Sequence, residues 1–141
     1  AFKFKKNLFS LIFKKLKFFT GKVAAGNPSL VEDYTEGDLN LHDHLIPNPE
    51  KSFIVRVSGD SMIDVGVHPD DLLIVDHSKE PTNGSIVIAV VNGELTVKRL
   101  CKNDSGLFLM PENPGYAGIE ITEETQFHLW GVVTNVIHSL A

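Results

Sequence analysis

The chain has 141 residues, of which 43% are hydrophobic and 22% charged, and its formal net charge is −5. This composition excludes a largely disordered chain and fits one globular domain with an appendage. The charge is divided unevenly: residues 1–26 carry +7 from seven lysines and no acid, whereas the remaining residues carry −12. The sequence therefore predicts a basic arm on an acidic body, the arm either lying on that body or binding a membrane surface or nucleic acid.

The first 20 residues predict a basic amphipathic segment. Leu8, Ile12, Leu16 and Phe19 fall on one face of a helix, which leaves an interfacial helix open. Lysines interrupt the apolar residues, so that the longest unbroken apolar run is Leu11–Phe13. A secretion signal needs about 7–15 apolar residues and a membrane span about 20. We therefore expect neither a signal sequence nor a membrane span.

Residues 21–51 predict a linker, because glycine and proline recur there and apolar residues show little periodicity. Residues 52–141 instead contain a dense series of strand patterns and no long helical period. Asn92-Gly93 between two of these patterns is typical of a tight β-hairpin, because both turn positions need positive φ. The sequence therefore predicts a mainly β body, a compact sandwich or partly closed barrel. Its strands are expected at residues 53–57, 72–75, 85–91, 94–100, 107–110 and 128–137.

Two residues of this body are candidates for chemistry. Ser61 follows the first predicted strand beside Gly59, a setting in which a serine can present its hydroxyl and backbone N–H to a cleft, although most such serines are loop residues. Lys98 lies in a predicted strand, where a lysine usually faces solvent. Apolar surroundings would lower its pKa and make it a general base. A shift from about 10.4 to about 7 costs on the order of 4–5 kcal/mol, which a compact β body can supply by desolvation.

The other chemistry-bearing residues indicate no stronger site. The six histidines show no zinc-binding spacing, and we expect no metal and no other cofactor. A triad of Ser61, His68 and an acid stays open, because triads are spatial arrangements. Cys101 is the single cysteine, which permits no internal disulfide and fits a reducing compartment, and no neighbour in the sequence activates it as a nucleophile. Gly115 and Gly118 lack the pattern of a phosphate-binding loop.

Taken together, the serine and lysine motifs resemble those of a known family. Ser58–Met62 followed by Asp70–Asp76 is similar to the nucleophile region of the LexA/UmuD self-cleaving proteins, and Gly93–Leu100 is similar to their lysine strand. The separation of 37 residues between Ser61 and Lys98 matches the family spacing. The resemblance covers about residues 20–141. Three further segments fit it: Leu109–Pro114, Trp130–Val133 and, as the cleavage segment, Ala25–Ser29.

The resemblance implies a serine endopeptidase with a Ser–Lys dyad that cuts its own chain between Ala25 and Gly26. Ser61 would be the nucleophile and Lys98 the general base. The backbone N–H groups of Asp60 and Ser61 would hold the oxyanion. The chain would then divide into an arm of residues 1–25 that cleavage removes, a linker of residues 26–51 and a β-rich peptidase domain of residues 52–141.

The length before the cleavage segment indicates the branch of the family. LexA and phage repressors carry a helix-turn-helix domain there, and 25 residues are too few for one, so we expect no sequence-specific DNA binding. The short arm and the stretch from Pro28-Ser29 to Glu32–Tyr34 resemble UmuD, although residues 1–19 differ from the usual arm. The resemblance then implies a cytoplasmic homodimer, cleaved in the SOS response with the help of RecA filaments on single-stranded DNA. The cleaved form would be the accessory subunit of a UmuC-like translesion polymerase.

Two alternatives stay open. A signal peptidase also uses a Ser–Lys pair, but it needs a membrane anchor, which the lysines at positions 14, 15 and 17 disfavour. A non-enzymatic module would use the β body to bind a polymerase and the arm only as a tether. The mass of the chain after prolonged alkaline incubation separates the protease from this binding module.

Overall fold

The computed structural model describes residues 16–28 and 36–141. The chain divides into two compact units, Ala1–His44 and Leu45–Ala141. Most of the predicted amphipathic segment, and the Glu32–Tyr34 stretch, lie outside the described residues. Within the described ranges, no helix has the length and apolar character that crossing a membrane requires.

The described part of the first unit is small and open to solvent. Strands β1 (Phe18–Phe19) and β2 (Glu36–Gly37) pair antiparallel over two residues. The residues from 22 to 28 are all exposed and form no helix or strand. The short helix α2 (Leu41–Leu45), which reaches the boundary between the units, contains no buried residue. This part of the chain therefore has little apolar burial to stabilise one conformation.

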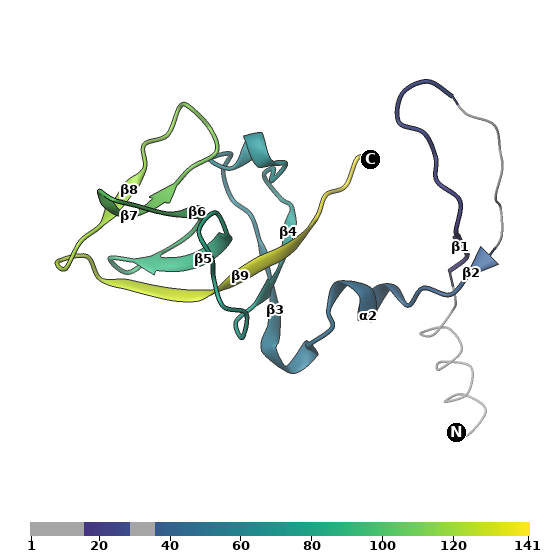
Figure 1. Cartoon of the computed structure of the whole chain (residues 1–141), viewed down its shortest axis with the longest axis horizontal. Helices are drawn as coiled ribbons and strands as arrows, with labels where there is room; N and C mark the ends of the chain where they lie inside the picture. The colour runs from purple at the N-terminus through teal and green to yellow at the C-terminus, as the bar shows by residue number, and fades with distance from the viewer. Residues whose placement is uncertain (1–15, 29–35) are drawn as a thin grey trace. The chain divides into compact units, whose positions relative to one another are not determined.

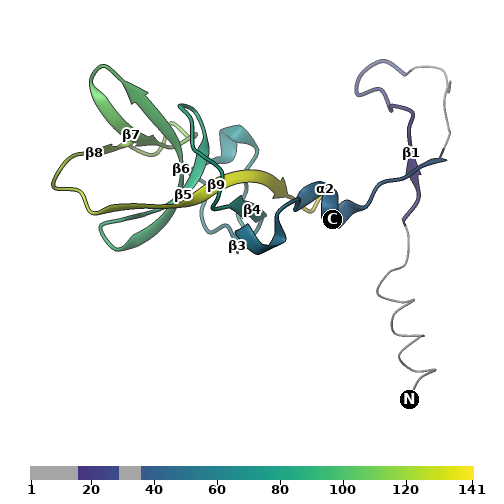
Figure 2. The same cartoon turned by 60° about the horizontal axis from the view of Figure 1, so that its bottom comes forward.

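The second unit is a seven-stranded antiparallel sheet in the order β3-β4-β9-β5-β6-β7-β8. Figures 1 and 2 label these strands. The mainly β prediction is confirmed, and the sheet stays open, with β3 and β8 as its edges. Two 3₁₀ turns, η1 (Pro49–Lys51) and η2 (Ile63–Val65), accompany it. The strands are β3 (Ser52–Arg56), β4 (Leu72–Asp76), β5 (Ile86–Val91), β6 (Glu94–Asn103), β7 (Gly106–Met110), β8 (Ile119–Ile121) and β9 (Phe127–Ile137).

The core lies on both faces of β5. Successive residues of a strand point to opposite faces, so Ile88 joins one buried cluster while Val87 and Ala89 join another. This explains why β5 is an unbroken apolar run rather than an alternating one. The first cluster consists of Val57, Met62, Val67, Leu73, Val75 and Ile88, and the second of Val87, Ala89, Val91, Leu109 and Val132.

The long strand β9 joins the two halves of the sheet, since it pairs with β4 and with β5 (yellow in Figures 1 and 2). Gly131 is required at its close approach to β4, because a Cβ there would lie 2.7 Å from Val75 Cγ1 and 2.9 Å from Asp76 O. The predicted hairpin is confirmed between β5 and β6, where Asn92 and Gly93 have φ of 50° and 84°. The sheet therefore brings β6 beside β5, which pairs Lys98 with Val87.

Candidate active site

Ser61 lies in the loop that connects β3 to β4. The base of this loop is closed by two backbone hydrogen bonds, from Val57 N–H to Asp71 O at 2.8 Å and from Asp70 N–H to Val57 O at 2.9 Å. Met62, directly after the serine, is 1% exposed and packs in the first core cluster. Because Met62 is fixed in the core and Ser61 is itself half-buried, the Ser61 side chain has few directions in which it can point.

A second loop, between β7 and β8, holds the Ser61 loop in place. Glu112 N–H donates to Ser61 O at 2.8 Å, and the Asn113 side-chain amide donates to Asp60 O at 2.9 Å. The Tyr116 hydroxyl donates to the Asp60 carboxylate at 2.5 Å, and this interaction raises the pKa of Tyr116. Residues 109–114 resemble the family motifs, but their sequence alone indicates no role for them. The structure shows them to be a support for the serine loop.

Lys98 on β6 reaches the serine. Its Nζ lies 3.2 Å from Ser61 Oγ, 2.8 Å from Thr96 Oγ1 and 3.1 Å from Val97 O. Strand alternation places Thr96 on the same face as Lys98, but its contact with the amine was not predicted. Ser61 and Lys98, 37 residues apart in the sequence, are therefore hydrogen-bonded neighbours in the fold.

Burial lowers the pKa of Lys98 below its ordinary value of 10.5. The cause is desolvation, which disfavours the ammonium form. In the part of the chain that the structure describes, no acid pairs with Lys98 to restore the charge. The amine lines a cavity of about 320 Å³ that also contains Ser61. The apolar residues of its wall are Val55, Val57, Leu73, Ile88, Leu95 and Val97.

The three contacts of Nζ can be made by either form of the amine. A neutral lysine has two N–H donors and one lone pair, whereas its ammonium has three donors and no acceptor. In the neutral form the two donors match Thr96 Oγ1 and Val97 O, and the lone pair faces the Ser61 hydroxyl. Such an amine can take a proton from the serine, which is what activates a hydroxyl as a nucleophile.

Two backbone donors lie beside the serine. Among the described residues, no group accepts a hydrogen bond from the N–H of Asp60 or of Ser61. Donors of this kind, held by a braced loop next to a nucleophile, can stabilise an oxygen that becomes negative during acyl transfer.

The alternative triad of Ser61, His68 and an acid would need a contact between His68 and Ser61, and the described residues show none. In the described ranges Ser61 Oγ has Lys98 as its side-chain partner, while His68 lies beside Asp71 and His138. Cys101 is a free, half-buried cysteine on β6.

Ala25 and Gly26 belong to the exposed segment of the first unit. Gly26 has φ of 151°, a backbone conformation that residues with a Cβ rarely adopt. A side chain at this position would strain the backbone and change how the chain leaves Ala25.

Comparisons with known proteins agree with the motifs. The family model described as Peptidase S24-like matches residues 17–134, a range that includes Ala25–Gly26, Ser61 and Lys98. The chain is 45% identical to Protein SamA of Salmonella typhimurium over 120 residues, covering 85% of this chain and 83% of that protein. It is 38% identical to Protein MucA of Escherichia coli over 126 residues, covering 89% and 84%. It is also 39% identical to LexA repressor 1 of Pseudomonas putida over 118 residues, covering 83% of this chain and 58% of the repressor.

Proposed function

The chain belongs to the Peptidase S24-like family, and on that premise we propose that it is a UmuD-like protease of the SOS response that cuts its own Ala25–Gly26 bond. The observation that carries the proposal is the contact of 3.2 Å between Lys98 Nζ and Ser61 Oγ in a cavity whose wall is partly apolar. Desolvation there lowers the pKa of the lysine, which favours the neutral form that a general base needs.

The reaction would proceed through an acyl-enzyme. Neutral Lys98 accepts the proton of Ser61 while Oγ attacks the carbonyl carbon of Ala25. The N–H groups of Asp60 and Ser61 hold the oxyanion of the tetrahedral intermediate. The proton on Lys98 then passes to the amine of Gly26 as the peptide bond breaks. In the second half, Lys98 accepts a proton from water, whose oxygen attacks the ester carbon; Lys98 then returns this proton to Ser61 Oγ as the ester bond breaks, which releases the fragment that ends at Ala25 with a free carboxylate.

The substrate segment has features that suit this role. Its exposed backbone is free to extend across a cleft, and the methyl group of Ala25 fits a shallow pocket. Because the substrate is part of the same chain, its effective concentration is high and the check on reaction is conformational. A RecA filament on single-stranded DNA would accelerate cleavage by favouring the state in which the segment occupies the cleft.

The proposed cleavage divides the chain by function. Residues 1–25 form the removed arm, residues 26–51 the linker and residues 52–141 the peptidase domain. The retained part, as a homodimer, would be the accessory subunit of a UmuC-like translesion polymerase. The similarity to SamA and MucA over more than four fifths of each protein supports this assignment. Ser61 and Lys98 supply both nucleophile and base, so the proposed reaction requires no cofactor.

The test follows the intact mass of the purified chain from pH 7 to pH 10, with and without RecA, single-stranded DNA and a nucleotide. We expect two products, the larger beginning at Gly26, and faster cutting with the filament. Ser61→Ala should stay intact, while Ser105→Ala, an exposed serine of the β6–β7 turn, should cleave like the parent. An intact parent after long alkaline incubation, or cleavage of Ser61→Ala at the parental rate, would overturn the protease assignment.

A further inference from the structure

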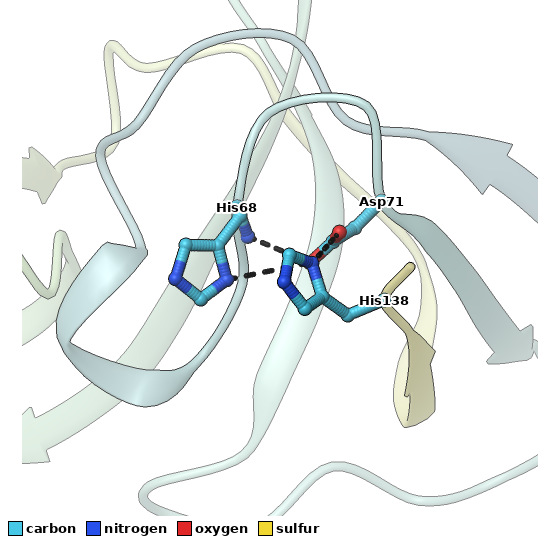
Figure 3. Close-up of side chains that lie close together, drawn as sticks. All are labelled: His68, Asp71 and His138. Atoms are coloured by element: carbon cyan, nitrogen blue, oxygen red, sulfur yellow. Dashed lines mark hydrogen bonds and ion pairs between the residues drawn. The ribbon is translucent and has the colours of Figure 1, made fainter. Parts of the chain in front are cut away.

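A second cluster of side chains lies outside the Ser–Lys site. His68 and Asp71 come from the loop before β4, and His138 directly follows β9, so segments far apart in the sequence meet there (Figure 3). The Asp71 side chain is 3% exposed, which makes it a nearly buried carboxylate. Its Oδ1 lies 2.5 Å from His138 Nδ1, and its Oδ2 accepts the backbone N–H of His68 at 2.8 Å.

One nitrogen in this cluster is unsatisfied. His68 Nδ1 is buried and, among the described residues, has no hydrogen-bond partner. It lies 3.7 Å from Asp71 Oδ2, which is beyond hydrogen-bonding distance. The rings of His68 and His138 lie with centroids 4.5 Å apart and planes tilted by 32°. Because buried polar atoms normally have a partner, this nitrogen is available to a ligand that the protein side chains do not provide.

We propose that His68, Asp71 and His138 bind a divalent first-row transition metal ion of the Zn²⁺ type. Two imidazole nitrogens and one carboxylate oxygen form a donor set that Zn²⁺ takes in proteins, with water in the fourth position. One ligand atom from each residue lies within 4.8 Å of the other two. The ion would enter between Asp71 and the two rings, replace the hydrogen bond of His138 and give His68 Nδ1 its partner.

The chain can accommodate the ion with small movements. Bonds from Zn²⁺ to nitrogen and oxygen are about 2.0–2.2 Å, so the three ligand atoms must adjust around a common centre. His138 follows the last strand and its side chain is 37% exposed, so its ring can move without disturbing the sheet. Asp71 supplies a negative charge that offsets part of the charge of the cation.

Metal binding would connect two distant parts of the body. Asp71 O accepts the hydrogen bond that closes the base of the Ser61 loop, and His138 begins the C-terminal segment. The ion would therefore tie the segment that follows β9 to the base of that loop. A ligand that binds only the folded state raises its stability by mass action, so the melting temperature should rise with the metal concentration.

The experiment titrates Zn²⁺ into the metal-free full chain at pH 7 by calorimetry and follows thermal unfolding in parallel, with the intact mass recorded before and after. We expect one equivalent to bind and the melting temperature to rise. His138→Ala should weaken binding at least about tenfold and remove the thermal shift. His128→Ala, an exposed histidine on β9 outside the cluster, is the matched control and should bind like the parent.

Two variants of the cluster are tested, so that a folding defect in one of them does not decide the result. His138→Ala changes a side chain after the last strand, and circular dichroism checks that its sheet is intact. His68→Ala removes the second imidazole and should also weaken binding. No saturable binding to the parent, or equal binding by the His138→Ala and His128→Ala variants, would overturn the site. This outcome is independent of self-cleavage, which is read from the mass of the chain.

Discussion

The two units of the molecule differ in what holds their residues in place. In the described part of the first unit, two residues of β1 pair with two of β2, and the segment containing Ala25–Gly26 is exposed. In the second, Ser61 and Lys98 belong to elements anchored on a seven-stranded sheet with a buried core. A dyad works only while its groups stay within hydrogen-bonding reach, whereas a scissile bond must be free to extend into a cleft. Under the proposed function, one chain thus combines a rigid enzyme with an adaptable substrate.

The largest expected effect comes from removing the proposed base, Lys98, from the second unit. Lys98→Met keeps a long side chain but has no amine to accept the Ser61 proton. We expect self-cleavage to fall by about 10²- to 10⁴-fold, the usual contribution of a general base. The rate is measured from the intact mass over time at pH 9.

Two further lysine variants sharpen this prediction. Lys98→Arg keeps the positive charge but has no neutral form at these pH values, so it should be as inactive as Lys98→Met. Lys102→Met makes the same change at an exposed position of the same strand and should leave the rate unchanged. Cleavage by Lys98→Arg near the parental rate would show that the amine is not the base.

The next largest effect comes from changing the proposed substrate segment and leaving the body unchanged. Ala25→Asp brings a carboxylate into a cleft that Lys98 and Arg56 also line, where a negative charge favours the ammonium form of Lys98. We expect cleavage to slow by about 100-fold, since each unit by which the pKa of Lys98 rises leaves about tenfold less neutral amine. Because residue 25 is exposed, thermal unfolding of the body should be unchanged. Ala141→Asp is the matched control, and equal rates for the two variants would contradict the assigned cleavage site.

The sequence predicted the body better than the details of its site. Long apolar runs such as Ile86–Val91 and the Asn92-Gly93 turn are local signals, and the strands they predict are present. Strand β8 was missed because its three residues are too few for a pattern. Ser61 and Lys98 were each weak candidates alone and became specific only through their joint resemblance to a family.

The contacts around the dyad could not have been predicted, because they depend on which loops meet in space. The bonds from Asn113 and Tyr116 to Asp60 span more than fifty residues of sequence. The same is true of the His68–Asp71–His138 cluster, in which Asp71 and His138 are 67 residues apart in the sequence. Sequence spacing reveals metal motifs only when the ligands are close together along the chain.

The third prediction concerns the dependence of the cleavage rate on pH, which distinguishes a buried lysine base from an exposed one. In the proposed mechanism the base is the neutral amine of Lys98, whose population rises with pH until the pKa of Lys98 is passed. Because burial lowers that pKa, the rate should rise about tenfold per pH unit and level off below 10.5. A fully exposed lysine would level off only near its ordinary value. A rate that does not change between pH 7 and pH 10 would contradict lysine as the base.

The smallest expected effect comes from removing a contact that orients the amine of Lys98 towards Ser61. Thr96→Val keeps the shape of the side chain but removes the oxygen that accepts a hydrogen bond from Lys98 Nζ at 2.8 Å. A hydrogen-bond acceptor favours the ammonium form, so its loss should lower the pKa of Lys98 further and move the pH profile to lower pH. The rate at the plateau should fall about two- to tenfold, because Nζ then loses one of the contacts that orient it towards Ser61. Thr134→Val, the same change at an exposed position of β9, should alter neither the plateau nor the midpoint. If the pH profile of the cleavage rate moved to higher pH in Thr96→Val, the threonine would disfavour the charged amine. The proposed role of Thr96 in orienting Lys98 would then be wrong.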